Sequence, residues 1–194
     1  MAGQNKIKPE NCREAAFLIL NRVEDAGAYA DILLQDALVT LDVRERALAT
    51  ELVYGVLRYR LRLDWIIGRF SKLKTNKLET RVLNALRLGV YQLCFLDGIP
   101  GASAVDEAVK LIKKGGAKKA GFVNAVLRAV TARKDKIIYP DEKKRGAICL
   151  DILFPSPVAR KALDGAPGRI RRNGAAQNQP YSSSEDVADK HHRH

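Results

Sequence analysis

The sequence contains few cysteines, and their spacing argues against two common ways of holding a small domain together. Cys12, Cys94 and Cys149 are the only three in 194 residues, and no two of them form a CxxC pair. Zinc sites and disulfide frameworks show closely or regularly spaced cysteines, so neither is expected. Cys12 and Cys94 lie in apolar helical patterns, which favour buried thiols. Such a chain suits a reducing cytoplasm.

Long apolar segments are also absent. The first residues, MAGQNKIKPENC, have no apolar signal core, and no apolar run approaches the ~20 residues that span a bilayer. We therefore expect a cytoplasmic protein with no membrane partner. The three histidines, His191, His192 and His194, lie at the end of the chain, where solvated side chains are expected in preference to a metal site.

Acidic residues are outnumbered by basic ones. Lys and Arg total 34 against 22 Asp and Glu, which gives a formal net charge of +12. A polyanion is the natural partner for such a field, with nucleic acid first and an anionic membrane surface second. A basic surface with no nucleic-acid role remains the alternative at this point.

Apolar residues recur at helical spacing from Pro9 to Arg133, and no run of useful length alternates with the period of a strand. Asp42, Asn76 and Ser103 are expected to cap the starts of helices, and Gly27 is expected to end the first one. The sequence thus predicts an all-α fold, a bundle of about seven helices around one core. The expected helices span residues 9–27, 31–38, 42–60, 63–70, 76–96, 103–116 and 122–130.

The stretch GGAKKAGFVNAVLRAV, residues 115–130, raises three possibilities: a phosphate-binding loop, an RNA-docking helix or an ordinary capped helix. It lacks the GKS or GKT ending of a P-loop, and no strand precedes it. The simplest interpretation is that Gly115 and Gly116 end one helix and that Phe122 to Val130 form the core face of the next. Asn124, among apolar neighbours, is expected to hydrogen-bond inside the bundle in preference to contacting a base.

The composition changes after Tyr139. Residues 140–154 read as a linker, and residues 155–194 are rich in Pro, Gly, Ser, Asn and charge, which predicts a disordered tail without a packed core. The helical domain is therefore assigned to residues 1–139.

Several stretches resemble a known family. TELVYGVLRYRLRLDWIIGRF, LRLGVYQLCFLDGIPGASAVDEAVKLIKK and GFVNAVLRAV are similar to the NusB-type helical domain, in particular to the version that forms the N-terminal domain of ribosomal RNA cytosine-5 methyltransferase B, the Sun or RsmB family. AYADILLQDAL fits that version better than the free antitermination factor. The resemblance covers about residues 10–140. It implies a helical bundle that binds RNA, here 16S ribosomal RNA, ahead of a Rossmann-type domain that uses S-adenosylmethionine.

The catalytic features of that family are not visible. Its catalytic cysteine and a second cysteine each occur in a Pro-Cys setting, whereas no cysteine here follows a proline, and no glycine-rich cofactor loop follows a strand. We therefore expect no catalytic residue, cofactor or metal in this chain, and no methyltransferase activity from it alone.

The tail departs from the family pattern. Where the family continues with a stretch like LSIRYSHPEWLVKRW, this chain reads LDILFPSPVARKALDGAP. Dropping one nucleotide after Phe154 permits a reading close to the family pattern. Our hypothesis is that the coding frame changes there and that residues 155–194 are out-of-frame sequence. A genuine divergent tail is the alternative.

The candidate RNA contacts are basic residues near the first helix and around the glycine turn, where a helix N-terminus offers free N–H groups to a phosphate. They are Lys6, Lys8, Arg13, Arg22, Lys113, Lys114, Lys118 and Lys119. A solvated turn is the alternative for each lysine there. Tyr54, Tyr59 and Trp65 could stack on bases, although their helical spacing among leucines favours the core. The alternative functions are a stand-alone antitermination factor, which would bind leader RNA and a ribosomal protein, and a protein-interaction bundle.

Overall fold

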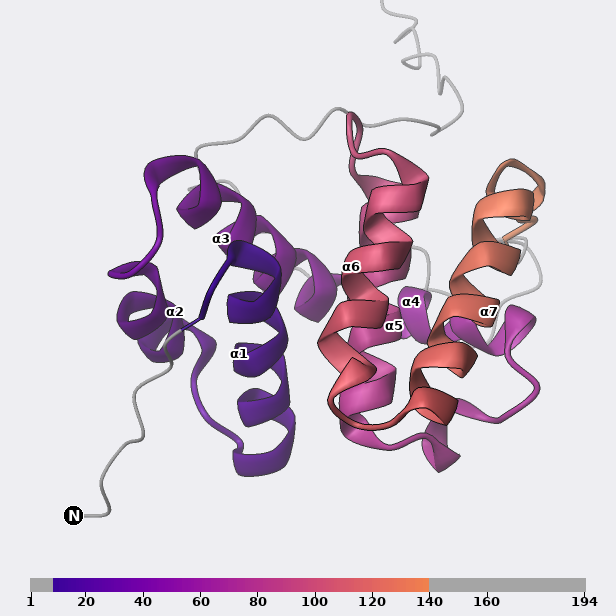
Figure 1. The fold of residues 1–194 in the computed structure, drawn as a ribbon, viewed down its shortest axis with the longest axis horizontal. Helices are drawn as coiled ribbons and strands as arrows, with labels where there is room; N and C mark the ends of the chain where they lie inside the picture. Colours follow the sequence, from indigo (N-terminus) through magenta and orange to yellow (C-terminus); the bar gives the residue numbers. More distant parts are fainter. Residues whose placement is uncertain (1–8, 140–194) are drawn as a thin grey trace, which may run out of the picture.

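The structure is a computed structural model that describes residues 9–139, and this part of the chain is all-helical (Figure 1). Its seven α-helices and two short 3-10 turns confirm the expected all-α bundle. In chain order the elements are α1 (Cys12–Ala26), α2 (Ala30–Leu38), α3 (Val43–Arg58), α4 (Arg60–Phe70), η1 (Thr75–Lys77), α5 (Thr80–Phe95), α6 (Gly101–Lys113), α7 (Ala117–Arg133) and η2 (Lys134–Lys136). No helix of these described residues is both long and apolar enough to cross a bilayer.

Local capping chemistry fixes the ends of the first and third helices. Asn11 Oδ1 accepts a hydrogen bond from the Glu14 backbone N–H at 2.9 Å at the start of α1, and α1 ends at Gly27, whose φ is +60°. Asp42 Oδ1 accepts from the Glu45 N–H at 2.8 Å at the start of α3. Both side chains satisfy donors that have no partner within the helix. The predicted cap at Asp42 and stop at Gly27 are confirmed.

Three helices begin away from their expected positions, α1 at Cys12, α4 at Arg60 and α7 at Ala117, and two predicted caps are wrong. Asn76 lies in η1, and Leu78 is extended (φ −83°, ψ 141°), so that α5 begins only at Thr80. Leu78 packs its side chain against the core, and this tertiary contact outweighs the capping signal at Asn76. α6 begins at Gly101, directly after Pro100, instead of at Ser103. Proline fixes its own φ and favours a position at a helix start.

Helix α5 lies at the centre of the bundle and contacts α1, α3, α4, α6 and α7. Apolar residues at helical spacing predict one buried face, yet the structure buries almost the whole circumference of α5 from Val82 to Leu93, including Asn84, Arg87 and Gln92. A helix enclosed by others must satisfy its polar side chains internally. The polar residues of α5 therefore pair with groups on the surrounding helices.

Two glycines allow helices to approach closely in this core. A Cβ atom on Gly55 would lie 2.1 Å from Cζ of Tyr91, and one on Gly89 would lie 2.5 Å from a δ-carbon of Leu127. The buried Tyr91 ring is further held by its hydroxyl, which donates to Glu51 Oε1 at 2.6 Å. Gly55 thus sets the spacing between α3 and α5, and Gly89 sets that between α5 and α7.

Candidate nucleic-acid interface

Arg13, in the first turn of α1, is oriented by the central helix. Its Nε donates to Gln92 Oε1 at 2.8 Å, and the Gln92 side chain, which is only 1% exposed, in turn donates from Nε2 to the Leu88 carbonyl at 3.0 Å. The half-buried Arg13 side chain is therefore held at the surface in one orientation. Lys6 and Lys8, which are close to it in sequence, lie outside the described residues.

Lys110 of α6 is an exposed cation paired with Glu107. The pKa of Lys110 is raised, because its ammonium donates to Glu107 Oε1 at 2.6 Å, while the charge of Arg13 acts on it in the opposite direction. Helices α1 and α6 also contact each other directly. Sequence reasoning missed Lys110, although Lys113 and Lys114 follow it at the spacing of neighbours on one helix face.

The lysines around the glycine turn are placed as the sequence predicted. α6 ends at Lys113, Gly116 takes a φ of +113°, and α7 begins at Ala117. Lys113, Lys114 and Lys118 are exposed and form no ion pair within residues 9–139. Lys119 is half-buried and its ammonium pairs with Glu79, so it is the least available of the four lysines. The remaining three cations surround a helix N-terminus that no side chain caps.

These positions form one basic face, which we define as Arg13, Lys110, Lys113, Lys114 and Lys118. In Figure 1 both α1 and α6 run from the top of the view to the bottom, and the turn between α6 and α7 lies at the lower end. Arg13 belongs to the first turn of α1, and the turn between α6 and α7 carries Lys113, Lys114 and Lys118. Lys110 lies one helical turn before Lys113 and Lys114 on α6 and is paired with Glu107.

Arg22 does not join this face. It lies nine residues after Arg13 on the same helix, which corresponds to two and a half turns and about 14 Å along the axis. It therefore projects from the opposite side of α1, where its half-buried side chain interacts with neighbouring residues. The structure thus separates Arg22 from the other described candidates.

The aromatic candidates have partners inside the protein. The Tyr59 ring packs against Phe95 and Tyr91, with centroids 4.7 and 6.2 Å away, which agrees with a core role. Tyr54 donates its hydroxyl to Asp31, and burial together with that hydrogen bond raises the pKa of Tyr54 to about 12. Tyr59 is therefore engaged by ring packing and Tyr54 by a hydrogen bond, both within the protein.

The described thiols are not set up for nucleophilic chemistry. Burial raises the pKa of Cys12, and it raises the pKa of Cys94 to about 11, whereas a reactive cysteine needs a lowered pKa. Within residues 9–139 no group of His, Cys, Asp and Glu side chains is arranged to hold a metal ion. Asn124 is half-buried in α7 and its side chain forms no hydrogen bond with the described residues, so the predicted hydrogen bond inside the bundle is not observed.

Comparison with known proteins gives one family and two kinds of relative. The model of the NusB family matches residues 10–132. The probable ribosomal RNA small subunit methyltransferase B of Bacillus subtilis is 37% identical over 127 residues, which cover 64% of this chain but only 28% of that protein. The transcription antitermination protein NusB of Agathobacter rectalis is 38% identical over 121 residues, covering 59% of this chain and 92% of that protein.

Solved structures agree with the family match. A structure of the antitermination factors NusB and NusE in complex with dsRNA superimposes with a TM-score of 0.57 at 30% identity, covering 62% of this chain and 93% of the other. T. maritima NusB superimposes with a TM-score of 0.59 at 27% identity, over 67% of this chain and 98% of the other. Both structures contain NusB, and almost the whole of each NusB chain superimposes on this one.

Proposed function

The chain belongs to the NusB family, and on that premise we propose that its helical domain binds RNA through the basic face. The observation that carries the proposal is the placement of Arg13, which the buried Gln92 holds at the surface of α1, a helix that contacts α6. The charges of Lys113, Lys114 and Lys118 extend this group to an open helix N-terminus, where a phosphate is favoured. Lys6 and Lys8 would add to the same end of α1, while Arg22 and Lys119 would contribute less.

We further propose that this domain is the RNA-positioning part of a 16S ribosomal RNA cytosine-5 methyltransferase. The chain spans about 28% of the methyltransferase relatives that it matches, so the S-adenosylmethionine site and the chemistry would belong to another domain. In such an enzyme the basic face would hold the RNA mainly by phosphate contacts, which position the substrate without reading its bases. The protein would act in the cytoplasm.

The second candidate is a stand-alone antitermination factor that binds leader RNA and a ribosomal protein. It is favoured by the NusB of Agathobacter rectalis, which is 38% identical against 37% for the Bacillus subtilis methyltransferase, and by the structural match to NusB in complex with NusE and dsRNA. The coding sequence separates the two candidates. A methyltransferase reading beyond Phe154 supports the first, and a natural stop codon soon after Arg133 supports the second.

Sequencing the gene beyond the codon of Phe154 also tests the proposed organisation of the chain. We propose that residues 140–154 lead toward a methyltransferase domain and that residues 155–194 arise from a change of frame. Both segments lie outside the described residues. A verified, uninterrupted frame with no methyltransferase reading in the shifted frame would refute the frame change.

RNA binding itself is tested by filter binding of the full chain to fragments of 16S ribosomal RNA over a range of salt concentrations. Binding that weakens linearly on a logarithmic salt scale is expected for phosphate contacts. Absence of binding at low salt would overturn the proposed function in both of its contexts.

A further inference from the structure

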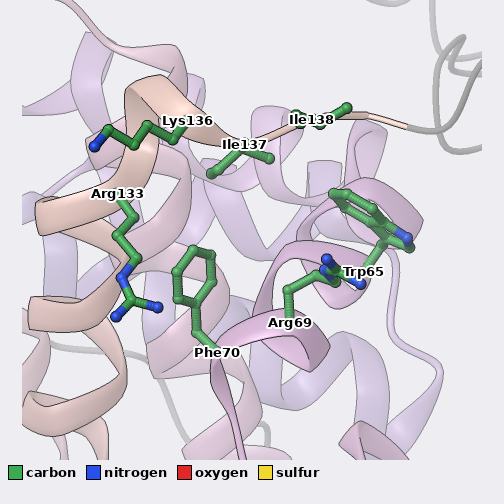
Figure 2. Close-up of a pocket in the computed structure, with 7 residues that line it drawn as sticks. All are labelled: Trp65, Arg69, Phe70, Arg133, Lys136, Ile137 and Ile138. Carbon is green, nitrogen blue, oxygen red and sulfur yellow. The ribbon is translucent and has the colours of Figure 1, made fainter.

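A hollow of about 210 Å³ opens between the end of α4 and the end of α7 (Figure 2), and none of the basic-face residues lines it. Trp65, Arg69 and Phe70 line it from α4. Arg133, at the last turn of α7, and Lys136 to Ile138, which follow, close the other side. The two halves are more than 60 residues apart in sequence, so only the packing of α4 against α7 creates this hollow.

The hollow is lined by three cations and no acid. Arg69, Arg133 and Lys136 are exposed, and none of them forms an ion pair with residues 9–139. By contrast, Arg87, Lys110 and Lys119 each have a carboxylate partner. Unpaired positive charge gathered around one concave surface favours an anionic ligand.

Aromatic rings lie among these cations. Figure 2 shows the Phe70 ring standing between Arg133 on one side and the pair of Arg69 and Trp65 on the other. The Arg69 guanidinium lies 5.8 Å from the centroid of the Trp65 ring, and the Tyr139 ring stacks on Trp65 with the two centroids 5.6 Å apart. The Phe70 ring therefore lines the hollow, and the Trp65 ring, which stacks on Tyr139, lines it beside Arg69.

From this arrangement we propose that the hollow, here called the α4/α7 pocket, binds one nucleotide of a single-stranded RNA. A planar base would pack on Phe70 beside Trp65, and the flanking phosphates would contact Arg133, Lys136 and Arg69, because stacking rings combined with cations are how single strands are held. Its volume is below the range of about 300–1,000 Å³ usual for a complete small ligand, which suits one unit of a longer chain.

This inference rests on the proposed function, but it concerns a second contact surface on α4 and α7. RNA that occupies both surfaces would pass from the basic face to the end of α7. An acidic peptide would satisfy the cations equally well, although it would leave the rings without a flat partner. The test must therefore separate a base from a carboxylate.

Trp65 makes the test direct, because it is the only tryptophan in the chain. Oligouridylate added to the full chain should quench Trp65 fluorescence, and polyglutamate of matched charge should not. Arg133→Glu with Lys136→Glu should abolish the quench and lower the magnitude of the salt slope by about 1.4, the value for two single-strand phosphate contacts. Phe70→Leu should weaken the quench-detected binding about fivefold or more through lost stacking.

Lys74→Glu with Lys77→Glu is the control for net charge, since both lysines are exposed in the segment between α4 and α5 and do not line the pocket. The control should retain the quench, and all variants should keep the helical melt of the wild type. Equal quenching by polyglutamate, or a quench that survives the Arg133 and Lys136 changes, would overturn the proposal that the α4/α7 pocket binds a nucleotide. RNA binding that persists in filters without any Trp65 quench would overturn the pocket alone, whereas no RNA binding at all would overturn the proposed function.

Discussion

The guanidinium of Arg87 forms a two-pronged hydrogen bond with the carboxylate of Asp64, with Nε–Oδ1 and Nη2–Oδ2 distances of 2.7 and 2.8 Å. Its Nη1 donates to Glu24 at 2.6 Å and to Asn84 at 2.9 Å. Burial lowers the pKa of Arg87, but the hydrogen bonds and charges of Asp64 and Glu24 more than offset this and raise it. The side chain is only 3% exposed, so the arrangement ties α1, α4 and α5 together in the centre of the bundle.

Asp64→Asn is expected to destabilise the fold by about 3 kcal/mol, because removing one partner leaves a buried charge partly uncompensated. Because Glu24 still pairs with Arg87, the loss of stability is expected at the low end of the range of about 3–5 kcal/mol for breaking a buried ion pair. The measurement is urea unfolding followed by circular dichroism. Glu107→Gln is the matched control, since its partner Lys110 is exposed, and it should change the stability little. Equal effects of the two changes would contradict the structural role of Arg87.

Gly55→Ala and Gly68→Ala should shift stability in opposite directions. A Cβ at Gly55 would collide with the hydrogen-bonded Tyr91 ring, so we expect a loss of about 1–3 kcal/mol from overpacking. Gly68, in α4, has nothing within 4 Å of the added atom, and alanine there should stabilise by about 0.5–1 kcal/mol through helix propensity. Thermal melts of both variants test this, and a stabilising Gly55→Ala would rule out the close approach of α3 and α5.

Lys113→Glu with Lys118→Glu should weaken RNA binding for all sequences and lower the magnitude of the salt slope by about 1.4, because two single-strand phosphate contacts are lost. Both lysines are exposed and form no ion pair within the described residues, so the fold should be unchanged. Arg171→Glu with Arg172→Glu makes the same change of charge in the C-terminal segment and should matter much less. Filter binding over a salt series compares the two. If only the C-terminal variant loses binding, the basic face is in the wrong place.

Gln92→Leu should separate the orientation of Arg13 from its charge. The substitution removes the acceptor of the Arg13 Nε hydrogen bond while leaving the net charge at +12. RNA affinity is expected to fall about 2- to 10-fold, the scale of one hydrogen bond, with no change in the salt slope. Filter binding gives both quantities. An unchanged affinity in a variant that melts like the wild type would show that the position of Arg13 does not matter for RNA.

Thiol reactivity should report the burial of the cysteines. In a Cys149→Ser variant, alkylation of Cys94 at pH 8 is expected to be about 100-fold slower in the folded than in the unfolded protein, because a pKa of about 11 in place of 9.0 lowers the thiolate fraction by that factor. The pKa of Cys94 is higher in the folded than in the unfolded protein, so the protonated thiol favours the folded state. This contribution to stability is complete below pH 9 and is lost as the pH rises toward 11. Rapid labelling of Cys94 at pH 8 would contradict its burial.

The sequence by itself determined the helical class and several helix ends. Apolar residues at helical spacing, Asp42 followed three residues later by Glu45, and Gly27 after the first helix act through neighbours within one or two turns, so local chemistry decides them. The glycines at 115 and 116 likewise end α6 for local reasons, and the cluster of lysines around them follows directly. The stretches that carry the family resemblance, such as GFVNAVLRAV, are also continuous in sequence.

Only the tertiary structure decided which polar residues are buried and which cations meet. Arg87 reads as one more surface arginine, because its partners Asp64 and Glu24 are 23 and 63 residues away in sequence. The packing of Leu78 outweighs the capping signal at Asn76, Arg13 meets Gln92 from 79 residues away, and helix phase places Arg22 on the opposite side of α1. The α4/α7 pocket joins Trp65 to Arg133 in the same way. Contacts between distant segments form only when the chain closes around α5, and no pattern of neighbouring residues encodes them one at a time.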